Sequence, residues 1–475
     1  MPPKKNNNNS KKGGKKQDDD DFDTLLAQAV KETKSDAVKN HKNNANHNKS
    51  DENNAQKYKS YADKDAVVPS KADHPENPYP PAVEGGKRQT WPEPTLTIKE
   101  QFPSGKGFPA GPEMPYTEEM LKVIANDSTQ RVTSEEERAM KRASQAAQLE
   151  DLREAAEVHR QVRTWAQSWI KPGLPLIYIT DKIEKKLNEL IVKDGIVRGQ
   201  AFPTGISINH CAAHFTPNHG EDEKIILEYD DVMKIDFGTQ INGRIIDCAW
   251  TYAANEVKYE NLLKAVREST YEGIKQAGVD VRLCDVGAAI EEVMESYEVE
   301  INNKVFPVKS IRNLCGHNIA PYFIHGGKSV PIIKGGEQVK MEEGELFAIE
   351  TFGSTGKGYV SEEGDCSHYM LQRGMEGIAL RSDKAAQLLK HIQKHYSTLA
   401  FCRKWLDRDG QDRHLLYLNQ LCDSGAVHRY PPLCDVRGSY TAQVEHTIFL
   451  KEGSRRLFSK GRGFIKNKTN KQTIV

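Results

Sequence analysis

The stretch KIDFGTQINGRIIDCAW, residues 234–250, constrains the fold most because it predicts a β-hairpin of defined register. Asn242-Gly243 is a strong signal for a two-residue hairpin turn, and β-branched residues flank it on both sides. This turn pairs the strands as Ile241 with Arg244, Gly238 with Asp247, and Asp236 with Ala249. Asp247 is then the diagonal neighbour of Asp236 on one face of the hairpin.

Two carboxylates at this separation, less than about 7–8 Å between Cβ atoms, can hold a pair of divalent cations. We expect Gly238, opposite Asp247, to leave that face open. Without cations, two buried carboxylates would repel each other, and one would bind a proton. A surface hairpin with two solvated aspartates is the alternative.

The tripeptide Asp-Phe-Gly at residue 236 also occurs in protein kinases, where its aspartate holds magnesium. The companion motifs are absent, however: no H-R-D-x-x-x-x-N loop precedes Asp236, and no strand resembles V-A-I-K. The glycine-rich piece GSTGKGYV lies downstream and is not a Walker A sequence. The sequence therefore excludes a kinase.

Further candidate metal ligands lie in three other segments. They are a histidine after glycine in LCGHNIAPYFIHGG, Glu350 in the apolar strand LFAIETFG, and Glu445 in YTAQVEHTIFL. A carboxylate in an apolar strand is costly unless it is paired or binds a metal, although a glutamate on an edge strand can also face water. One imidazole with four carboxylates suits Mn, Fe, Co or Zn.

The composition changes sharply along the chain, which divides it into parts. Residues 1–80 are rich in Lys, Asn and Asp, and carry too few apolar side chains to offset the entropy of ordering them. We expect a disordered tail, a Pro-rich linker at 81–115, a folded α+β domain at 116–461 that begins near Tyr116, and a basic C-terminal extension at 462–475.

Within the folded part, helical and strand patterns alternate. The longest helical pattern begins after Ser134 as N-cap. A second covers residues 261–277 before the stop signal Gly278, and a third is capped by Asp285, with Val286, Ile290, Val293 and Tyr297 on its inner face. LFAIETFG and YTAQVEHTIFL are expected to be strands.

Charge and cysteine content restrict the cellular setting. Lys and Arg number 67, as do Asp and Glu, so a global nucleic-acid-binding charge is absent and no specific DNA binding is expected. No apolar run is long enough for a membrane helix, and the N-terminus lacks a signal-peptide core. The eight cysteines form no C-x-x-C pair and predict packed, reduced thiols. We expect a cytoplasmic protein.

Asp236, Asp247, His317, Glu350 and Glu445, in this order and these contexts, resemble the ligand set of the methionine aminopeptidases. These enzymes are metallopeptidases with a pita-bread fold. The resemblance is closest to the type 2 group and extends over roughly residues 116–461. It includes AFPTGISINHCAAHFTPN, KIDFGTQINGRIIDCA and YPPLCDVRGSYTAQVEHTI.

The resemblance implies two divalent metal ions per chain (Co, Mn, Fe or Zn) and a metal-activated hydroxide that attacks the first peptide bond. Asp247 and Glu445 would bridge both ions, Asp236 would complete one, and His317 and Glu350 the other. Glu350 would also transfer protons, and His214 and His325 would contact the substrate. The positions that match the methionine pocket are Phe202, Pro203, Ile324, Phe352, His368, Ala400 and Tyr430.

The implied function is cotranslational removal of the initiator methionine from nascent polypeptide N-termini with a small second residue. A helical insertion at about residues 366–430 is a type 2 feature. The tail would associate with ribosomes or translation initiation factor 2, and the chain is expected to be a monomer. Three alternatives remain: a prolidase or aminopeptidase P, a non-catalytic RNA-binding relative associated with translation, and a nucleic-acid-binding winged helix within the insertion.

Overall fold

The structure, a computed structural model, describes residues 77–126, 135–411 and 413–460 of the 475-residue chain. Three sequence expectations concern residues outside these ranges: the tail up to residue 76, the Ser134 cap, and the extension after residue 461.

An antiparallel sheet of order β2-β4-β5 contains the predicted hairpin. Its strands are β2 (Arg198–Ile208), β4 (Val232–Ile241) and β5 (Arg244–Ala253). The predicted register is confirmed, because Gly238 pairs with Asp247 and Asp236 with Ala249. Asn242 and Gly243 both have positive φ angles, 51° and 75°, as a two-residue turn of this kind requires.

A second antiparallel sheet has the order β1-β18-β17-β11-β9-β10, and β8 also pairs with β11. Its strands are β1 (Glu113–Pro115), β8 (Lys309–Ser310), β9 (Cys315–Ile319), β10 (Ser329–Pro331), β11 (Leu346–Ser354), β17 (Thr441–Leu450) and β18 (Ser454–Leu457). The two strands predicted from LFAIETFG and YTAQVEHTIFL are thus confirmed as β11 and β17.

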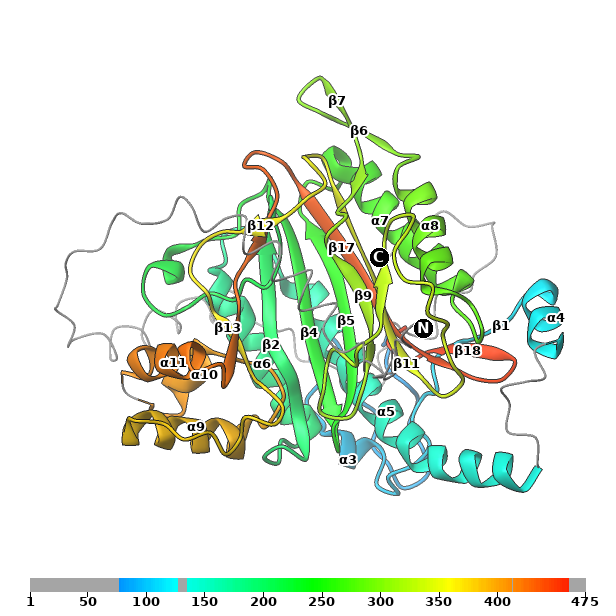
Figure 1. The fold of residues 1–475 in the computed structure, drawn as a ribbon, viewed down its shortest axis with the longest axis horizontal. Helices are drawn as coiled ribbons and strands as arrows, with labels where there is room; N and C mark the ends of the chain where they lie inside the picture. The colour runs from blue at the N-terminus through cyan, green and yellow to red at the C-terminus, as the bar shows by residue number, and fades with distance from the viewer. Residues whose placement is uncertain (1–76, 127–134, 412, 461–475) are drawn as a thin grey trace, which may run out of the picture. The chain divides into compact units, whose positions relative to one another are not determined.

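Threonine side chains join the two sheets where β5 lies beside β17 (Figure 1). The Thr447 hydroxyl accepts the Asp247 N–H at 2.8 Å and donates to the Asp247 carbonyl at 2.6 Å. Thr251 makes the same pair of bonds to the backbone of Gln443, at 2.8 and 2.7 Å. The seam between β5 and β17 therefore fixes Asp247 next to the strand that carries Glu445.

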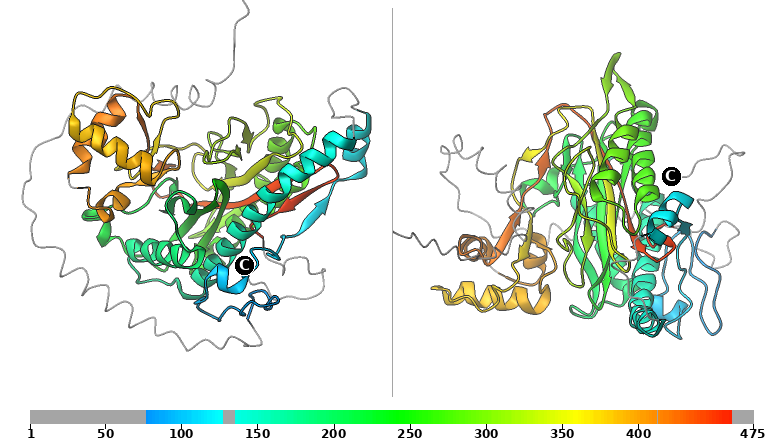
Figure 2. Two further views of the ribbon diagram at one scale, coloured as in Figure 1. Left: turned by 90° about the horizontal axis from the view of Figure 1, so that it is seen from below. Right: turned by 45° about the vertical axis from the view of Figure 1, so that its right-hand side comes forward.

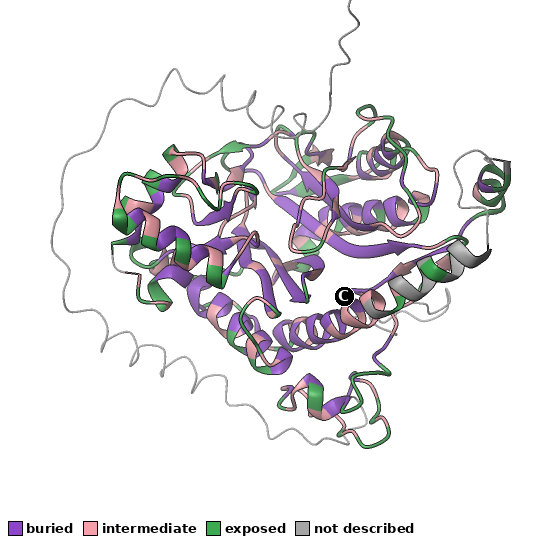
Figure 3. Cartoon of the chain, turned by 60° about the horizontal axis from the view of Figure 1, so that its bottom comes forward, coloured by how far each residue is buried: buried purple, intermediate pink, exposed green. Residues whose placement is uncertain are grey.

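Two pairs of helices cover the sheets. The helix α5 (Glu135–Trp169) packs on β4 and β5, and α6 (Leu176–Ile191) packs on β2. The helix α7 (Glu256–Gln276) packs on β11 and β17, and α8 (Leu283–Met294) packs on β10. The C-terminal half of α5 is mostly buried (Figure 3). None of the helices in the described part of the chain is both long and apolar enough to cross a membrane.

Two details of the predicted helices differ from the structure. The N-cap of α8 is Arg282, and Asp285 lies in the first turn, where its carboxylate pairs with the Arg282 guanidinium at 2.8 Å. An acidic side chain in a first turn is favoured by the helix dipole, so the sequence signal resembles that of a cap. The inner face of α8 continues through Met294, which is buried, whereas Val293 is only half-buried.

Short elements complete the two-sheet body. They are α3 (Ile98–Gln101), α4 (Glu118–Asn126), β3 (Cys211–Ala213), η2 (Glu221–Lys224), β6 (Glu298–Ile301), β7 (Lys304–Pro307), β12 (Ser361–Glu362) and β16 (Leu433–Cys434). The strands β12, β16 and β3 form a separate three-stranded sheet, and β6 and β7 form a hairpin.

Residues 77–115 pack on the body, which differs from the expected start of folded structure near Tyr116. Ile98, Phe102 and Phe108 are buried in the same apolar cluster as α5 and α6. Buried Gln89 donates to the Gln161 side chain of α5 at 2.9 Å. Sequence reasoning missed this packing because the anchoring side chains are widely spaced among Pro, Gly and charged residues.

Residues 366–430, which we call the insertion segment, form a layer with their own apolar core. Its elements are β13 (His368–Leu371), α9 (Asp383–His395), β14 (Phe401–Cys402), α10 (Arg403–Arg408), α11 (His414–Asp423) and β15 (Val427–Tyr430). The three strands pair in the order β14-β13-β15, with the helices on them (Figure 2). The sequence predicted the helices but not this sheet.

Candidate metal centre

Five strands bring the predicted ligands together. Asp236 and Asp247 lie on β4 and β5 in the diagonal relation that the hairpin sets. Glu350 of β11 lies directly opposite Glu445 of β17. His317 of β9 pairs with Ala348, two residues before Glu350 on β11. Because the seam joins β5 to β17, the five side chains form one cluster, which we call the cage.

Distances within the cage are short enough for shared ions. His317 Nε2 lies 3.6 Å from an Asp247 oxygen and 3.7 Å from a Glu350 oxygen. Asp247, His317 and Glu445 are buried, and each offers a ligand atom within 4.8 Å of those of the other two. These separations exceed hydrogen-bond length, as expected for atoms arranged around a cation.

Burial dominates the electrostatics of the cage. Desolvation and mutual repulsion raise the pKa of Asp247, Glu350 and Glu445 well above the usual range, and burial raises the pKa of Asp236 to about 6. Burial also lowers the pKa of His317 to about 4, so that its imidazole is neutral. Four such carboxylates are compatible with their ionised forms only if cations balance the charge.

Three carboxylate oxygens also indicate that the cage suits metal ions. Asp236 Oδ1, Asp247 Oδ1 and Glu445 Oε2 are buried and have no hydrogen-bond partner. Buried polar atoms rarely remain unpaired in a folded protein. Oxygen-rich ligation with one imidazole suits Mn, Fe, Co or Zn, in agreement with the sequence analysis.

Gln443 is a cage neighbour that sequence reasoning missed. Its side-chain nitrogen donates to Asp236 Oδ2 at 3.3 Å and to Glu350 Oε2 at 3.1 Å. It thereby orients one carboxylate from each sheet. The alternation of β17 could have identified it, because Gln443 is two residues from Glu445 and so lies on the same strand face.

A series of rings connects the cage with the insertion segment. Ring centroids are separated by 4.7 Å from His317 to His325, 6.3 Å from His325 to Tyr430, 5.8 Å from Tyr430 to His214, and 6.1 Å from His214 to His368. Burial lowers the pKa of His214 to about 4 and that of His368 to about 3. The expected substrate-contacting histidines therefore lie together as neutral rings beside the cage.

The apolar positions expected to line a methionine pocket are divided between two clusters. Phe202, Ile324, Ala400 and Tyr430 belong to one cluster, and Phe352 belongs to the other. Pro203 is buried on β2.

The expectation that Gly238 leaves the hairpin face open needs a correction. A Cβ atom at Gly238 would lie 2.3 Å from the Phe202 ring, so this ring fills the space above the glycine. Gly238 therefore allows Phe202 to approach the strand next to Asp247.

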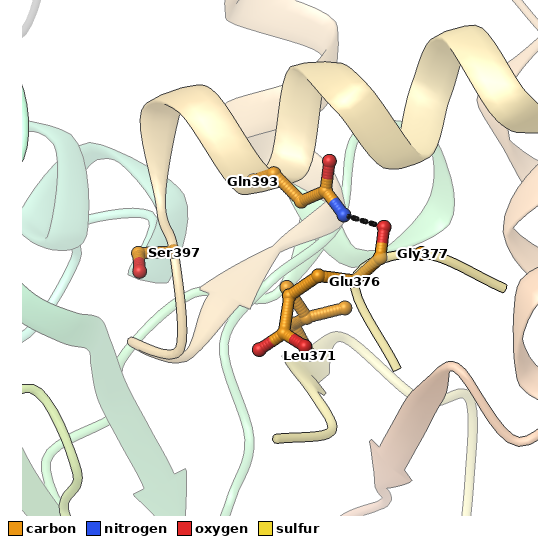
Figure 4. A pocket seen from close by; sticks show the side chains of 5 residues that line it. All are labelled: Leu371, Glu376, Gly377, Gln393 and Ser397. Carbon is orange, nitrogen blue, oxygen red and sulfur yellow. Dashed lines mark hydrogen bonds between the residues drawn. The ribbon is translucent and has the colours of Figure 1, made fainter. Parts of the chain in front are cut away.

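A pocket of about 410 Å³ lies within the insertion segment (Figure 4). It is lined by Leu371, Glu376, Gly377, Gln393 and Ser397. None of these residues is a cage ligand, so this pocket is separate from the candidate metal centre.

Comparisons with known proteins agree with this geometry. Metallopeptidase family M24 matches residues 150–396. Methionine aminopeptidase 2A of Arabidopsis thaliana is 54% identical over 78% of this chain and 80% of its own length. Methionine aminopeptidase 2 of Dictyostelium discoideum is 52% identical over 80% of this chain and 83% of its own.

A solved structure of a thermophilic Arx1 superposes with a TM-score of 0.55 at 17% identity, covering 66% of this chain and 90% of that chain. At this identity the similarity concerns the fold alone. The comparisons confirm the predicted α+β pita-bread fold and the resemblance read from the sequence. The chain belongs to the methionine aminopeptidase 2 group of metallopeptidase family M24.

Proposed function

We propose that this protein removes the initiator methionine from nascent polypeptides with a small second residue, using two divalent ions held in the cage. The observation that carries the proposal is the cage itself, in which four carboxylates and one neutral imidazole converge. Asp247, Glu445 and His317 are buried, and three carboxylate oxygens lack partners. The relatedness to methionine aminopeptidases supplies the substrate.

Each cage residue has a proposed place. Asp247 and Glu445 lie at the seam between the sheets and would contact both ions. Asp236 would complete the shell of one ion, and His317 and Glu350 that of the other. Bound divalent ions at such a site polarise a carbonyl and lower the pKa of water. Mn, Fe, Co and Zn all suit this donor set.

The remaining residues would hold the peptide and transfer protons. Glu350 has a raised pKa, which suits a group that accepts and returns a proton during amide cleavage. His214 and His325 are neutral and can donate or accept hydrogen bonds to the peptide backbone.

The methionine side chain would lie against apolar and ring positions from both the body and the insertion segment. These are Phe202, Pro203, Ile324, Phe352, His368, Ala400 and Tyr430. A pocket of this kind favours an unbranched, polarisable side chain such as methionine.

The proposal is tested with purified full-length protein supplied with Mn or Co. It should release methionine from Met-Ala-Ser peptides and leave Met-Lys peptides intact. Asp247→Asn should abolish methionine release and metal uptake together, because the side chain loses one charged oxygen at the shared position. Turnover by Asp247→Asn would contradict the ligand assignment.

We further propose that the protein acts as a cytoplasmic monomer, and that its Lys- and Asp-rich tail associates with ribosomes or translation initiation factor 2. The tail's basic run KKNNNNSKKGGKK supports contact with RNA or an acidic surface. Full-length chain should co-sediment with ribosomes at low salt, and chain lacking residues 1–76 should not. Equal co-sedimentation of both would contradict a role for the tail.

A further inference from the structure

Residues 320–328, which we call the β9–β10 loop, connect β9 to β10 and carry Ile324 and His325. Both residues belong to the proposed substrate site. The loop follows the strand of the cage residue His317, and the His317 and His325 rings lie 4.7 Å apart between centroids. The contacts that hold this loop therefore decide where two substrate-contacting side chains lie relative to the cage.

The tip of the β9–β10 loop is a tight turn that contains an unusual residue. The Ala320 and Phe323 N–H groups each donate to the carbonyl of the other residue, at 2.9 and 3.0 Å. Pro321 suits the first central position of a type II turn, and the second central position requires a positive φ angle, which glycine or asparagine usually supplies. Tyr322 occupies that second position with a φ angle of 60°. A bulky residue in this conformation persists only where its surroundings hold it in place.

The turn of the β4–β5 hairpin provides the first contact of Tyr322. The Tyr322 N–H donates to the Gly243 carbonyl at 2.9 Å. The Tyr322 ring lies directly on Gly243, because a Cβ atom there would be 2.2 Å from a ring carbon. The same hairpin carries the cage residues Asp236 and Asp247. The tip of the β9–β10 loop is therefore attached, through both backbone and ring, to the hairpin that positions two candidate metal ligands.

The insertion segment provides the second contact of Tyr322. The Thr398 hydroxyl donates to the Tyr322 carbonyl at 2.6 Å. Thr398 lies two residues before Ala400, a proposed pocket residue, and the intervening Leu399 is buried. Leu399 and Ile324 belong to one apolar cluster, against which Tyr322 and Ala400 pack. This hydrogen bond therefore joins the loop that carries Ile324 to the segment that carries Ala400.

The base of the β9–β10 loop is fixed on the other side of His325. The Asn318 carbonyl accepts the Gly326 N–H at 2.7 Å, and Asn318 Oδ1 accepts the Lys328 N–H at 2.8 Å. His325 thus lies between Gly326, which is bonded to β9, and Tyr322, three residues earlier. A change at Tyr322 would alter the direction in which the chain enters Ile324 and His325.

We propose that Tyr322 is a positioning residue for methionine release, because it fixes Ile324 and His325 between the β4–β5 turn and the insertion segment. This inference rests on the proposed function. Tyr322 acts through the residues that follow it, so its loss should disturb the binding of the peptide and leave the five cage ligands in place. Small displacements of substrate-contacting groups are sufficient for large kinetic effects.

Thr398→Val tests the contact with the insertion segment in full-length protein supplied with Mn or Co. The substitution keeps the size of the side chain but removes the donor to the Tyr322 carbonyl. We expect KM for Met-Ala-Ser peptides to rise about tenfold and kcat to change less than about twofold, because contacts made to the bound peptide are weakened. Bound metal per chain and the urea midpoint of unfolding should stay at the wild-type values. Thr398→Ser is the matched control, since it keeps the hydroxyl and should keep the wild-type KM.

Tyr322→Ala tests the contact with the hairpin turn, because it removes the ring from Gly243. We expect kcat/KM to fall at least about tenfold, and Tyr322→Phe, which retains the ring, to recover most of the wild-type value. A double-mutant cycle with His325→Ala shows whether Tyr322 acts through His325. In the His325→Ala background, Tyr322→Ala should lower kcat/KM by less than about threefold, because a coupled pair is not additive.

The outcomes separate this inference from the proposed function. A wild-type protein that releases no methionine would contradict the proposed function itself. With an active wild-type protein, four results would overturn the inference alone. They are an unchanged KM in Thr398→Val, an equal rise of KM in Thr398→Ser, loss of bound metal in Thr398→Val, and additive effects of Tyr322→Ala and His325→Ala.

Discussion

His159 of α5 is a titratable side chain enclosed between the helix and β4. Its ring is fully buried, stacks on Phe237 at a centroid distance of 4.0 Å, and has Nε2 2.9 Å from the Phe237 carbonyl. Since a carbonyl only accepts, Nε2 carries a proton and donates it. Nδ1 has no partner, so protonating it would place a charge in an apolar site.

We therefore predict that the buried, neutral His159 makes the folded protein less stable in acid. Burial holds its pKa well below the usual value of 6.5. Above pH 6.5 both folded and unfolded states are neutral at this ring. As the pH falls below 6.5, only the unfolded state binds the proton, and the free energy of unfolding drops by up to about 1.4 kcal/mol per pH unit.

Urea denaturation of metal-free protein between pH 7 and 5 measures this contribution. His159→Gln keeps a donor for the Phe237 carbonyl but cannot titrate. The difference in unfolding free energy between wild type and His159→Gln should change by about 1 kcal/mol for each pH unit below 6.5. Parallel curves would show that His159 becomes charged in the folded state.

At the residue scale, the sequence pointed to Glu350 and Glu445 because a carboxylate in an apolar strand is costly without a partner. It pointed to Asp236 and Asp247 because the hairpin register places them on one face. His317 was assigned only through the resemblance to a known ligand set. The sequence analysis missed Gln443, because an amide in a strand does not carry the free-energy cost of an unpaired carboxylate.

At the element scale, we predict that stability and metal binding depend on the seam between β5 and β17. Thr447 is fully buried, and its hydroxyl pairs with both backbone groups of Asp247. Thr447→Val keeps the shape but leaves a buried N–H and C=O without partners, at about 1–3 kcal/mol each. We expect a lower free energy of unfolding in urea together with weaker metal binding, because Asp247 loses its fixed distance from Glu445.

Thr447→Ser is the control for this seam, because it retains the hydroxyl and removes only a methyl group. It should bind metal like the wild-type protein. If Thr447→Val and Thr447→Ser were equally stable and active, the hydroxyl pair would not position Asp247.

At the element scale, some strand pairings could be predicted from the sequence and others could not. The β4–β5 hairpin was predicted to the residue because an Asn-Gly turn sets its register locally. The pairing of β11 with β9 and β17, and the side-by-side placement of β5 and β17, depend on contacts between distant segments that no local pattern specifies. The short strands β13, β14 and β15 were missed because they are only two to four residues long.

At the scale of the whole molecule, the insertion segment can contribute the proposed pocket residues His368, Ala400 and Tyr430 only if it stays fixed to the body. His368 Nε2 lies 2.5 Å from the Thr216 hydroxyl, which in turn donates to the Thr204 carbonyl at 2.7 Å. A second attachment lies at α6, where buried Lys404 contacts Glu184 at 3.3 Å. If the proposed pocket is correct, substrate binding should therefore depend on the packing of the insertion segment.

The attachment at α6 gives the last prediction. Glu184 accepts from the Trp405 indole at 2.8 Å, and Glu184 and Asp181 together raise the pKa of Lys404 although its burial opposes this. Glu184→Gln would leave the Lys404 charge poorly compensated, and breaking a buried pair costs about 3–5 kcal/mol. We expect faster hydrogen exchange in α9 and α11 and a higher KM for Met-Ala-Ser peptides, with a smaller change in kcat, because the cage residues all lie in the body.

Asp181→Asn is the control: this carboxylate is about half exposed, so water replaces much of its interaction with Lys404 and the effect should be smaller. Unchanged exchange and KM in Glu184→Gln would show that the contact between His368 and Thr216 is sufficient to hold the segment.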